Sequence, residues 1–322
     1  MTLPLIAALV AVLACLLVGR SAHLLLRNMR PAQAVVVLAL VSVTVSLASG
    51  MALTAIAVAV IASLTAVASD GHWSASIIRT EVPIPGWLGA LAALAVVVLM
   101  ARGAVRTVSI VMALVRADRL CRDIRADGGP VVVVDDESAD AYTVAGIRGC
   151  VVISQRLLTR LTADERRVLT AHELSHLTKR HHLYVHLADI AAAGNPLLAP
   201  VSAAVRLGVE RWADEDAATG IGDRRVTGRA LARVALLRSE MSRAIAVPTV
   251  GPLLVRVPVL GVGALLVASR VQALLQPKPR PYPGRAAAFL LLSVLVLLVG
   301  VASLNHIHDA IEGAAPYLRH GH

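Results

Sequence analysis

The sequence has few charged residues and very few aromatic ones. Asp, Glu, Lys and Arg make up 16% of its 322 residues and Phe, Trp and Tyr only 2%, whereas 57% are hydrophobic and the mean hydropathy is +0.72. Ordinary soluble domains contain about 25% charged residues. The composition therefore argues against a soluble domain and places the chain among membrane proteins.

Lysine is almost absent, because Lys179 and Lys278 are the only two. The formal net charge of +10 is therefore carried by arginine. A basic excess of this kind occurs in nucleic-acid-binding proteins and in proteins with cytoplasmic membrane loops. In a chain with several spans the positive-inside rule accounts for it, so we expect the lipid bilayer as a partner and no direct contact with nucleic acid.

Cysteine is also scarce. Cys15 lies in an apolar run, and Cys121 and Cys150 lie elsewhere, with no spacing that suits a zinc cluster or an even disulfide framework. This predicts a reducing, cytosolic setting for the polar part of the chain. Ser154 and Ser175, like the cysteines, lack a matched base and an orienting acid, which makes nucleophilic Ser or Cys catalysis a poor explanation.

Four apolar segments are long enough to cross a bilayer. We predict spans at about 2–19, 34–62, 87–106 and 286–304. The second belongs to an apolar stretch over 31–69, which as one straight helix would be about 57 Å long, and a hairpin broken near Ser49 and Gly50 is the alternative. One span is favoured, because a hairpin would put the later arginine-rich region outside the cell.

Charge in the loops predicts the orientation. Arg20, Arg27 and Arg30 follow the first span without an acidic residue, so we expect this loop in the cytoplasm and the N-terminus outside. The following spans then alternate, which predicts a cytoplasmic polar region and an extracytoplasmic C-terminus. No basic segment precedes the first span and no convincing cleavage site follows it, which argues against a signal peptide.

The predicted fold class is a mainly α multi-pass membrane protein with an inserted α+β domain that carries a small sheet. We predict an N-terminal membrane region at 1–116, a cytoplasmic domain at 117–276, and a last span with a short tail at 277–322. Within the domain, β-branched runs and glycine-containing turns predict strands at 131–134, 142–145 and 150–154, the last two as a hairpin around 146–149.

Helices follow these strands. A capping box, Thr162-Ala163-Asp164-Glu165, predicts the start of a helix that runs to about Arg180. Further helices are predicted at 201–218 and 229–243. The apolar stretch 247–275 is interrupted by Pro248, Pro252, Arg256 and Pro258, so we expect a membrane-surface segment or the packed floor of the domain rather than a span.

The first of these helices contains the sequence His172-Glu173-Leu174-Ser175-His176, an H-E-x-x-H pattern. Histidines four residues apart lie on one helical face and can bind a single zinc, with Glu173 beside the metal-bound water. The third ligand is predicted to be Glu210, because Asp214 shares its helical face and can accept the free N–H of a ligand histidine. Zinc would polarise the scissile carbonyl, and Glu173 would pass a proton from the water to the leaving amine.

Other polar residues near the motif allow alternatives. Glu215 and Asp216 compete with Glu210 but lie off its helical face. His181, His182 and His186 follow the motif as potential extra ligands or oxyanion donors. Their position at a predicted helix C-terminus instead favours a simpler role toward the helix dipole and solvent.

These residues resemble a known group, the integral-membrane zinc metallopeptidases of the gluzincin type, closest to the BlaR/MecR sensor-transducers and related to HtpX-like and CAAX-prenyl membrane proteases. The likeness covers roughly 117–276 and implies a zincin-like metallopeptidase domain. It implies zinc on His172, His176 and Glu210, Glu173 as the catalytic base, and Asp214 behind a ligand histidine. For substrate binding it implies an edge strand and a cytoplasmic arginine, at Ala141, Tyr142, Thr143 and Arg270.

Two features depart from that family. Asp140 stands where related proteases often have Asn, which puts a substrate-binding role there in doubt. About eighteen residues follow the last predicted span, where β-lactam sensor-transducers carry a large extracellular sensor domain. We therefore expect no direct acylation by a β-lactam, and a signal would have to enter through the short loops, the membrane or a separate sensor partner. The expected function is cleavage of a regulatory protein such as a BlaI/MecI-type repressor. A quality-control protease of the HtpX type and a non-catalytic membrane signalling scaffold are the alternatives.

Overall fold

The computed structural model describes residues 2–124, 129–135, 141–146, 149–245, 260–278 and 281–315. Several sequence predictions lie outside these residues. They are the role of Asp140, the centre of the 146–149 turn, the prolines and the arginine that interrupt 247–259, and the tail after residue 315.

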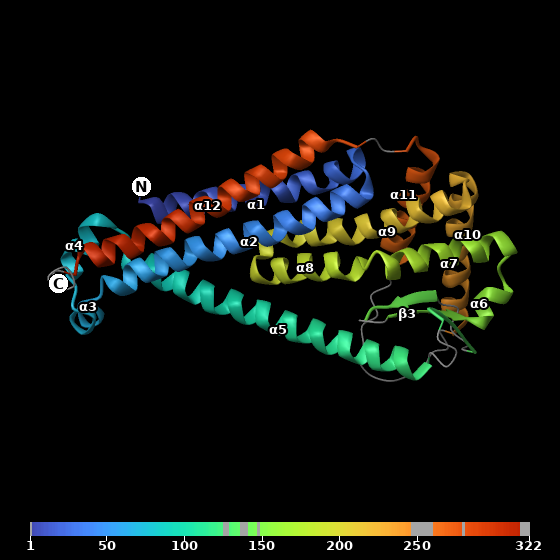
Figure 1. Cartoon of the computed structure of the whole chain (residues 1–322), viewed down its shortest axis with the longest axis horizontal. Coiled ribbons are helices and arrows are strands. Elements are labelled where there is room, and N and C mark those ends of the chain that lie inside the picture. The colour runs from blue at the N-terminus through green and yellow to red at the C-terminus, as the bar shows by residue number, and fades with distance from the viewer. Residues whose placement is uncertain are drawn as a thin grey trace.

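Four helices within the described residues are long and apolar enough to cross a membrane, namely α1 (Leu3–Asn28), α2 (Pro31–Ala62), α5 (Gly86–Ile124) and α12 (Pro283–Gly313). This confirms the predicted fold class. The helix α2 continues through Ser49 and Gly50, so this stretch is not a hairpin. The start of α1 and the end of α12 lie at the same end of the bundle as the short helices α3 (Thr65–Gly71) and α4 (Ala75–Glu81), opposite the small sheet (Figure 1).

The sheet has three strands, β1 (Val131–Val134), β2 (Ala141–Val144) and β3 (Cys150–Ser154), in the order β1-β3-β2. The strand β2 is antiparallel to β3 and begins one residue before its predicted start, whereas β1 is parallel to β3. Every residue of β3 is buried. The strand β2 has β3 on one side, and no described strand pairs with its other side.

A set of helices covers the sheet and connects it to the membrane bundle: α6 (Gln155–Thr159), α7 (Ala163–Thr178), α8 (His181–Gly194), the 3-10 helix η1 (Pro196–Leu198), α9 (Ala199–Ile221), α10 (Arg224–Ile245) and α11 (Leu260–Leu275). The predicted helices are present as α7, α9 and α10, whereas α8 was not predicted. The helix α11 is not among the candidate spans, and its Leu274 packs with Ala218 and Leu231. The C-terminal part of α11 therefore packs against α9 and α10.

The helices α8 and α9 form a hairpin that lies along α2 (Figure 1). Residues of both helices share one buried apolar cluster with α1 and α2, among them Ala188, Val201 and Val205. At the tip, Nδ2 of Asn195 donates to Oγ of Ser49, 2.9 Å away in the middle of α2. The structure thus inserts the α8–α9 hairpin into the helical bundle.

Glycine allows the close approach of α9 to α2. A Cβ atom on Gly208 would lie 2.6 Å from Cγ2 of Val35 and 2.9 Å from Cδ2 of Leu26. Any larger residue at position 208 must push α9 away from the first two spans, because protein interiors are close-packed. The position of α9 matters for the site because Glu210 follows two residues later.

The helix α5 is 39 residues long, which corresponds to roughly 58 Å and exceeds the hydrocarbon core of about 30 Å. It continues past residue 116, the predicted end of the membrane region, and its C-terminal end packs against the sheet. Along its length Arg106 forms an ion pair with Asp189 of α8, which also pairs with Arg206 of α9. Asp189 therefore links the third span to both helices of the hairpin.

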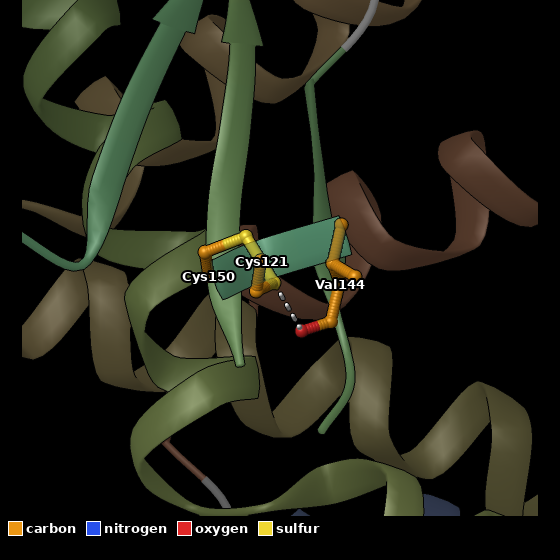
Figure 2. The surroundings of a disulfide bond; sticks show 3 residues. All are labelled: Cys121, Val144 and Cys150. Atoms are coloured by element: carbon orange, nitrogen blue, oxygen red, sulfur yellow. Dashed lines mark hydrogen bonds between the residues drawn. A yellow bond between two sulfur atoms is a disulfide. The ribbon is translucent and has the colours of Figure 1, made fainter. Parts of the chain in front are cut away.

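The end of α5 is also bonded covalently to the sheet. Cys121 and Cys150 form a disulfide with their Cα atoms 5.7 Å apart, and Sγ of Cys121 lies 3.9 Å from the carbonyl oxygen of Val144 (Figure 2). Both cysteines are buried. The sequence prediction of no disulfide framework is therefore wrong, because only the packing of α5 against β3 brings together two cysteines that are 29 residues apart.

Candidate metal centre

The helix α7 begins with the predicted capping box. Oγ1 of Thr162 accepts the backbone N–H of Glu165 at 3.4 Å, and Oε2 of Glu165 accepts the backbone N–H of Thr162 at 2.8 Å. This reciprocal pair satisfies two otherwise unpaired N–H groups and sets where the helix starts. The motif histidines follow within the same regular helix, where a four-residue spacing places both rings on one face.

His172, His176 and Glu210 form a cluster of three metal-binding side chains, each offering a ligand atom, with all three atoms within 4.8 Å of one another. The Nε2 atoms of the two histidines are 3.3 Å apart. Oε2 of Glu210 lies 3.7 Å from Nε2 of His172, and Oε1 lies 3.4 Å from Nε2 of His176. Two imidazole nitrogens and one carboxylate are a donor set that suits catalytic zinc.

Asp214 lies behind the first histidine, as the sequence predicts. Its Oδ1 atom is 3.1 Å from Nδ1 of His172, and Arg270 donates to both carboxylate oxygens, at 2.8 Å from Nε and 2.6 Å from Nη2. Burial alone would raise the pKa of Asp214, but the contacts with Arg270 and His172 outweigh it and hold the pKa at about 2. Asp214 is therefore a buried anion between Arg270 and His172.

Arg270 also reaches the metal cluster, since its Nη1 atom lies 2.8 Å from Oε2 of Glu210. The guanidinium of Arg270 thus holds the two carboxylates of α9 side by side. Resemblance to the family implied substrate binding for this residue. In the structure it lines the same cavity as the metal cluster while its charge is shared by Glu210 and Asp214.

Glu173 is 6% exposed and faces β2. The hydroxyl of Thr143 lies 3.0 Å from Oε2 of Glu173 and 2.9 Å from its main-chain oxygen. On the other side Nη2 of Arg238 is 3.8 Å from Oε1 and donates to the carbonyl oxygen of Ala141. Burial raises the pKa of Glu173 above its ordinary value.

The sequence analysis did not predict the positions of two residues beside the motif, Arg238 and His181. Arg238 lies on the arginine-lined α10, but its partners on α7 and β2 are distant in sequence and could not be read from the pattern. His181 was assigned to solvent at a helix C-terminus, and that prediction is wrong. It is 1% exposed, it is the first residue of α8, and its Nδ1 atom lies 3.0 Å from Nδ1 of His176.

A cavity of about 1440 Å³ contains the site. Its walls come from β2 and from α7 to α11, and much of the lining is aliphatic, for example Val185, Leu231 and Val267. All the predicted site residues line it except Asp214, which is buried behind His172. Those residues are Ala141, Tyr142, Thr143, His172, Glu173, His176, Glu210 and Arg270.

A comparison with protein families also indicates a metallopeptidase. Residues 113–247 match the model of Peptidase family M48, a range that begins within α5, ends after α10, and includes the motif and Glu210. No curated protein and no solved structure matches the chain. The four spans and the metal cluster agree with the family match. The chain therefore carries a membrane-bound metallopeptidase domain of family M48.

Proposed function

We propose that the chain is a zinc endopeptidase that uses His172, His176 and Glu210 to hold the metal and Glu173 as the general base. The observation that supports this most strongly is the convergence of these four side chains, from α7 and α9, in one cavity beside an edge strand. When bound, zinc polarises the scissile carbonyl and activates water for attack. Removal of zinc by a chelator should abolish cleavage, and adding zinc back should restore it.

Glu173 is prepared for proton transfer by its surroundings. Thr143 fixes the orientation of its carboxylate, and burial raises its pKa toward the range in which a carboxylate can take a proton and give it back. In this proposal Glu173 accepts a proton from the attacking water and delivers it to the amine that leaves. Arg238, 3.8 Å from Oε1, supplies positive charge beside the carboxylate during this exchange.

The substrate is proposed to lie along β2. An extended peptide can add as a further strand to the exposed side of a sheet, where main-chain hydrogen bonds bind many sequences. This places Tyr142, with 46% of its surface exposed, and Thr143 alongside the peptide. Because Thr143 contacts Glu173, a strand bound there passes next to the metal cluster.

We propose that the catalytic domain faces the cytoplasm. The C-terminal part of α1 and the two-residue link to α2 carry Arg20, Arg27 and Arg30 and no acidic residue, which is typical of the cytoplasmic side of a span. The disulfide between Cys121 and Cys150 is compatible with this side only as a transient bond, because cytosolic thiols are kept reduced by glutathione and thioredoxin. Its oxidation state in the cell therefore tests the orientation.

For the substrate we propose regulatory cleavage of a protein such as a BlaI/MecI-type repressor, on the basis of the sequence resemblance described above. The insertion of the α8–α9 hairpin between the spans favours a second candidate, quality control of membrane proteins, because Glu210 lies on a helix that packs against α2. Proteomics of cells with a Glu173→Gln chain separates the two. A repressor that accumulates uncleaved supports the first function, and accumulation of damaged membrane proteins supports the second.

A further inference from the structure

We propose that His181 is a positioning residue for the metal-binding His176. The proposal rests on the zinc site described above. A neutral histidine that binds a metal through Nε2 carries its proton on Nδ1, and that N–H needs an acceptor to fix the ring. Nε2 of His176 faces the cluster, 3.4 Å from Oε1 of Glu210, while its Nδ1 is 3.0 Å from Nδ1 of His181. In this proposal the Nδ1–H of His176 donates a hydrogen bond to Nδ1 of His181, and His181 carries its own proton on Nε2.

The backbone is shaped to make this contact. On a continuous α-helix a residue five positions on lies about 140° around the axis, so His181 would point away from His176. Instead, α7 ends at Thr178, and Arg180 adopts the left-handed conformation with φ 51° and ψ 45°. Residues other than glycine rarely adopt this conformation. The turn at Arg180 brings the two rings edge to face, with their centroids 4.8 Å apart.

The indole ring of Trp212 packs against the imidazole ring of His181. The rings of His181 and Trp212 have centroids 4.6 Å apart at an interplanar angle of 52°. Trp212 lies on α9 between Glu210 and Asp214, so the element that supplies the third ligand also packs against His181. Within the described part of the chain, Nε2 of His181 is buried and has no hydrogen-bond partner. Packing therefore fixes the ring, and Nδ1 makes its polar contact with His176.

The geometry argues against His181 as a further metal ligand. Its nitrogen meets Nδ1 of His176, on the side of that ring opposite Nε2, and the metal-binding cluster consists of His172, His176 and Glu210. The two metal histidines therefore have separate supports. Asp214 of α9 lies behind His172, and His181 of α8 lies behind His176.

Two substitutions separate positioning from packing. His181→Phe keeps a ring against Trp212 but removes the acceptor, whereas His181→Asn can place an amide oxygen near the position of Nδ1. Loss of an outer partner of a ligand histidine weakens metal binding about 10- to 100-fold. In the purified full-length protein we expect that loss of zinc affinity for His181→Phe and a change of less than about threefold for His181→Asn.

Zinc affinity is measured by competition with a chromophoric chelator, and the ligand field is read from the visible absorption bands of the cobalt-substituted protein. The band positions should change in His181→Phe and stay at the wild-type values in His181→Asn. His182→Phe is the matched control. His182 is the next residue of α8, and within the described residues its ring contacts His186 rather than His176.

Unchanged zinc affinity in His181→Phe would overturn the proposal. Equal losses in His181→Phe and His181→Asn, accompanied by equal losses of thermal stability in the metal-free proteins, would also overturn it, since they would show a role in packing alone. The affinity ratio is read without any substrate. It is therefore independent of whether the wild-type protein cleaves a peptide, which tests the proposed function separately.

Discussion

Arg270 is expected to hold α11 and the carboxylates of α9 together, and the substitution Arg270→Met tests this. The guanidinium is 15% exposed, and Asp214, which receives two of its N–H groups, is 2% exposed at the side chain. Removing one partner of a buried ion pair costs about 3–5 kcal/mol, because the other charge stays buried and unpaired. Glu210 is 38% exposed and is therefore expected to add little.

The remaining exposure of Arg270 favours the lower end of that range, about 3 kcal/mol. A loss of this size should lower the melting temperature of the metal-free protein by roughly 4 °C, because an unfolding entropy of about 2.1 cal/mol/K per residue applies to all 322 residues. The assay is thermal unfolding of the purified full-length chain in detergent, with the metal removed so that changes in zinc binding do not contribute. Arg224, which donates to the carbonyl oxygens of Ala273 and Leu274, continues to hold the end of α11 in this variant.

Two comparisons make the result specific. Arg233→Met removes an exposed arginine of α10 and should change stability by less than about 0.5 kcal/mol. Adding Asp214→Asn to Arg270→Met removes the unpaired charge and should recover part of the lost stability. A melting temperature of Arg270→Met equal to that of Arg233→Met would refute the argument that this ion pair holds the site together.

Two further predictions concern the position of α9 and the side of the membrane. Gly208→Ala should destabilise the protein by about 1–3 kcal/mol through a clash with Val35, whereas Gly220→Ala, in open space on the same helix, should stabilise it by about 0.5–1 kcal/mol. Melting temperatures that shift in the same direction would contradict this packing. Differential alkylation of intact cells should find Cys121 and Cys150 as thiols during normal growth and as a disulfide after treatment with an oxidant. A permanently oxidised pair would contradict the cytoplasmic orientation.

Local patterns were enough to predict the centre of the site. The capping box fixed the start of α7, the four-residue spacing fixed the common face of His172 and His176, and the same spacing linked Glu210 to Asp214. These features depend on helix geometry alone, which a sequence displays directly. The strands were found within one residue because β-branched runs between turn residues also form a local signal.

Features that depend on tertiary packing were missed. The contact between His181 and His176 requires a left-handed turn at Arg180, where no glycine marks it. The disulfide joins the end of α5 to β3, and Arg238 reaches Ala141 across 97 positions of sequence. Such contacts follow from how helices pack on the sheet. They could not be read from spacing or periodicity.

The central claim is that Glu173 performs proton transfer beside a metal held by other residues. The most direct measurement compares the purified wild-type chain with Glu173→Gln for bound zinc, by elemental analysis, and for cleavage of an unfolded protein such as labelled casein. We predict equal zinc content and a loss of cleavage of about 10²- to 10⁴-fold, the usual contribution of a general base. Cleavage by Glu173→Gln at the wild-type rate, or a wild-type protein that binds no zinc, would contradict the account.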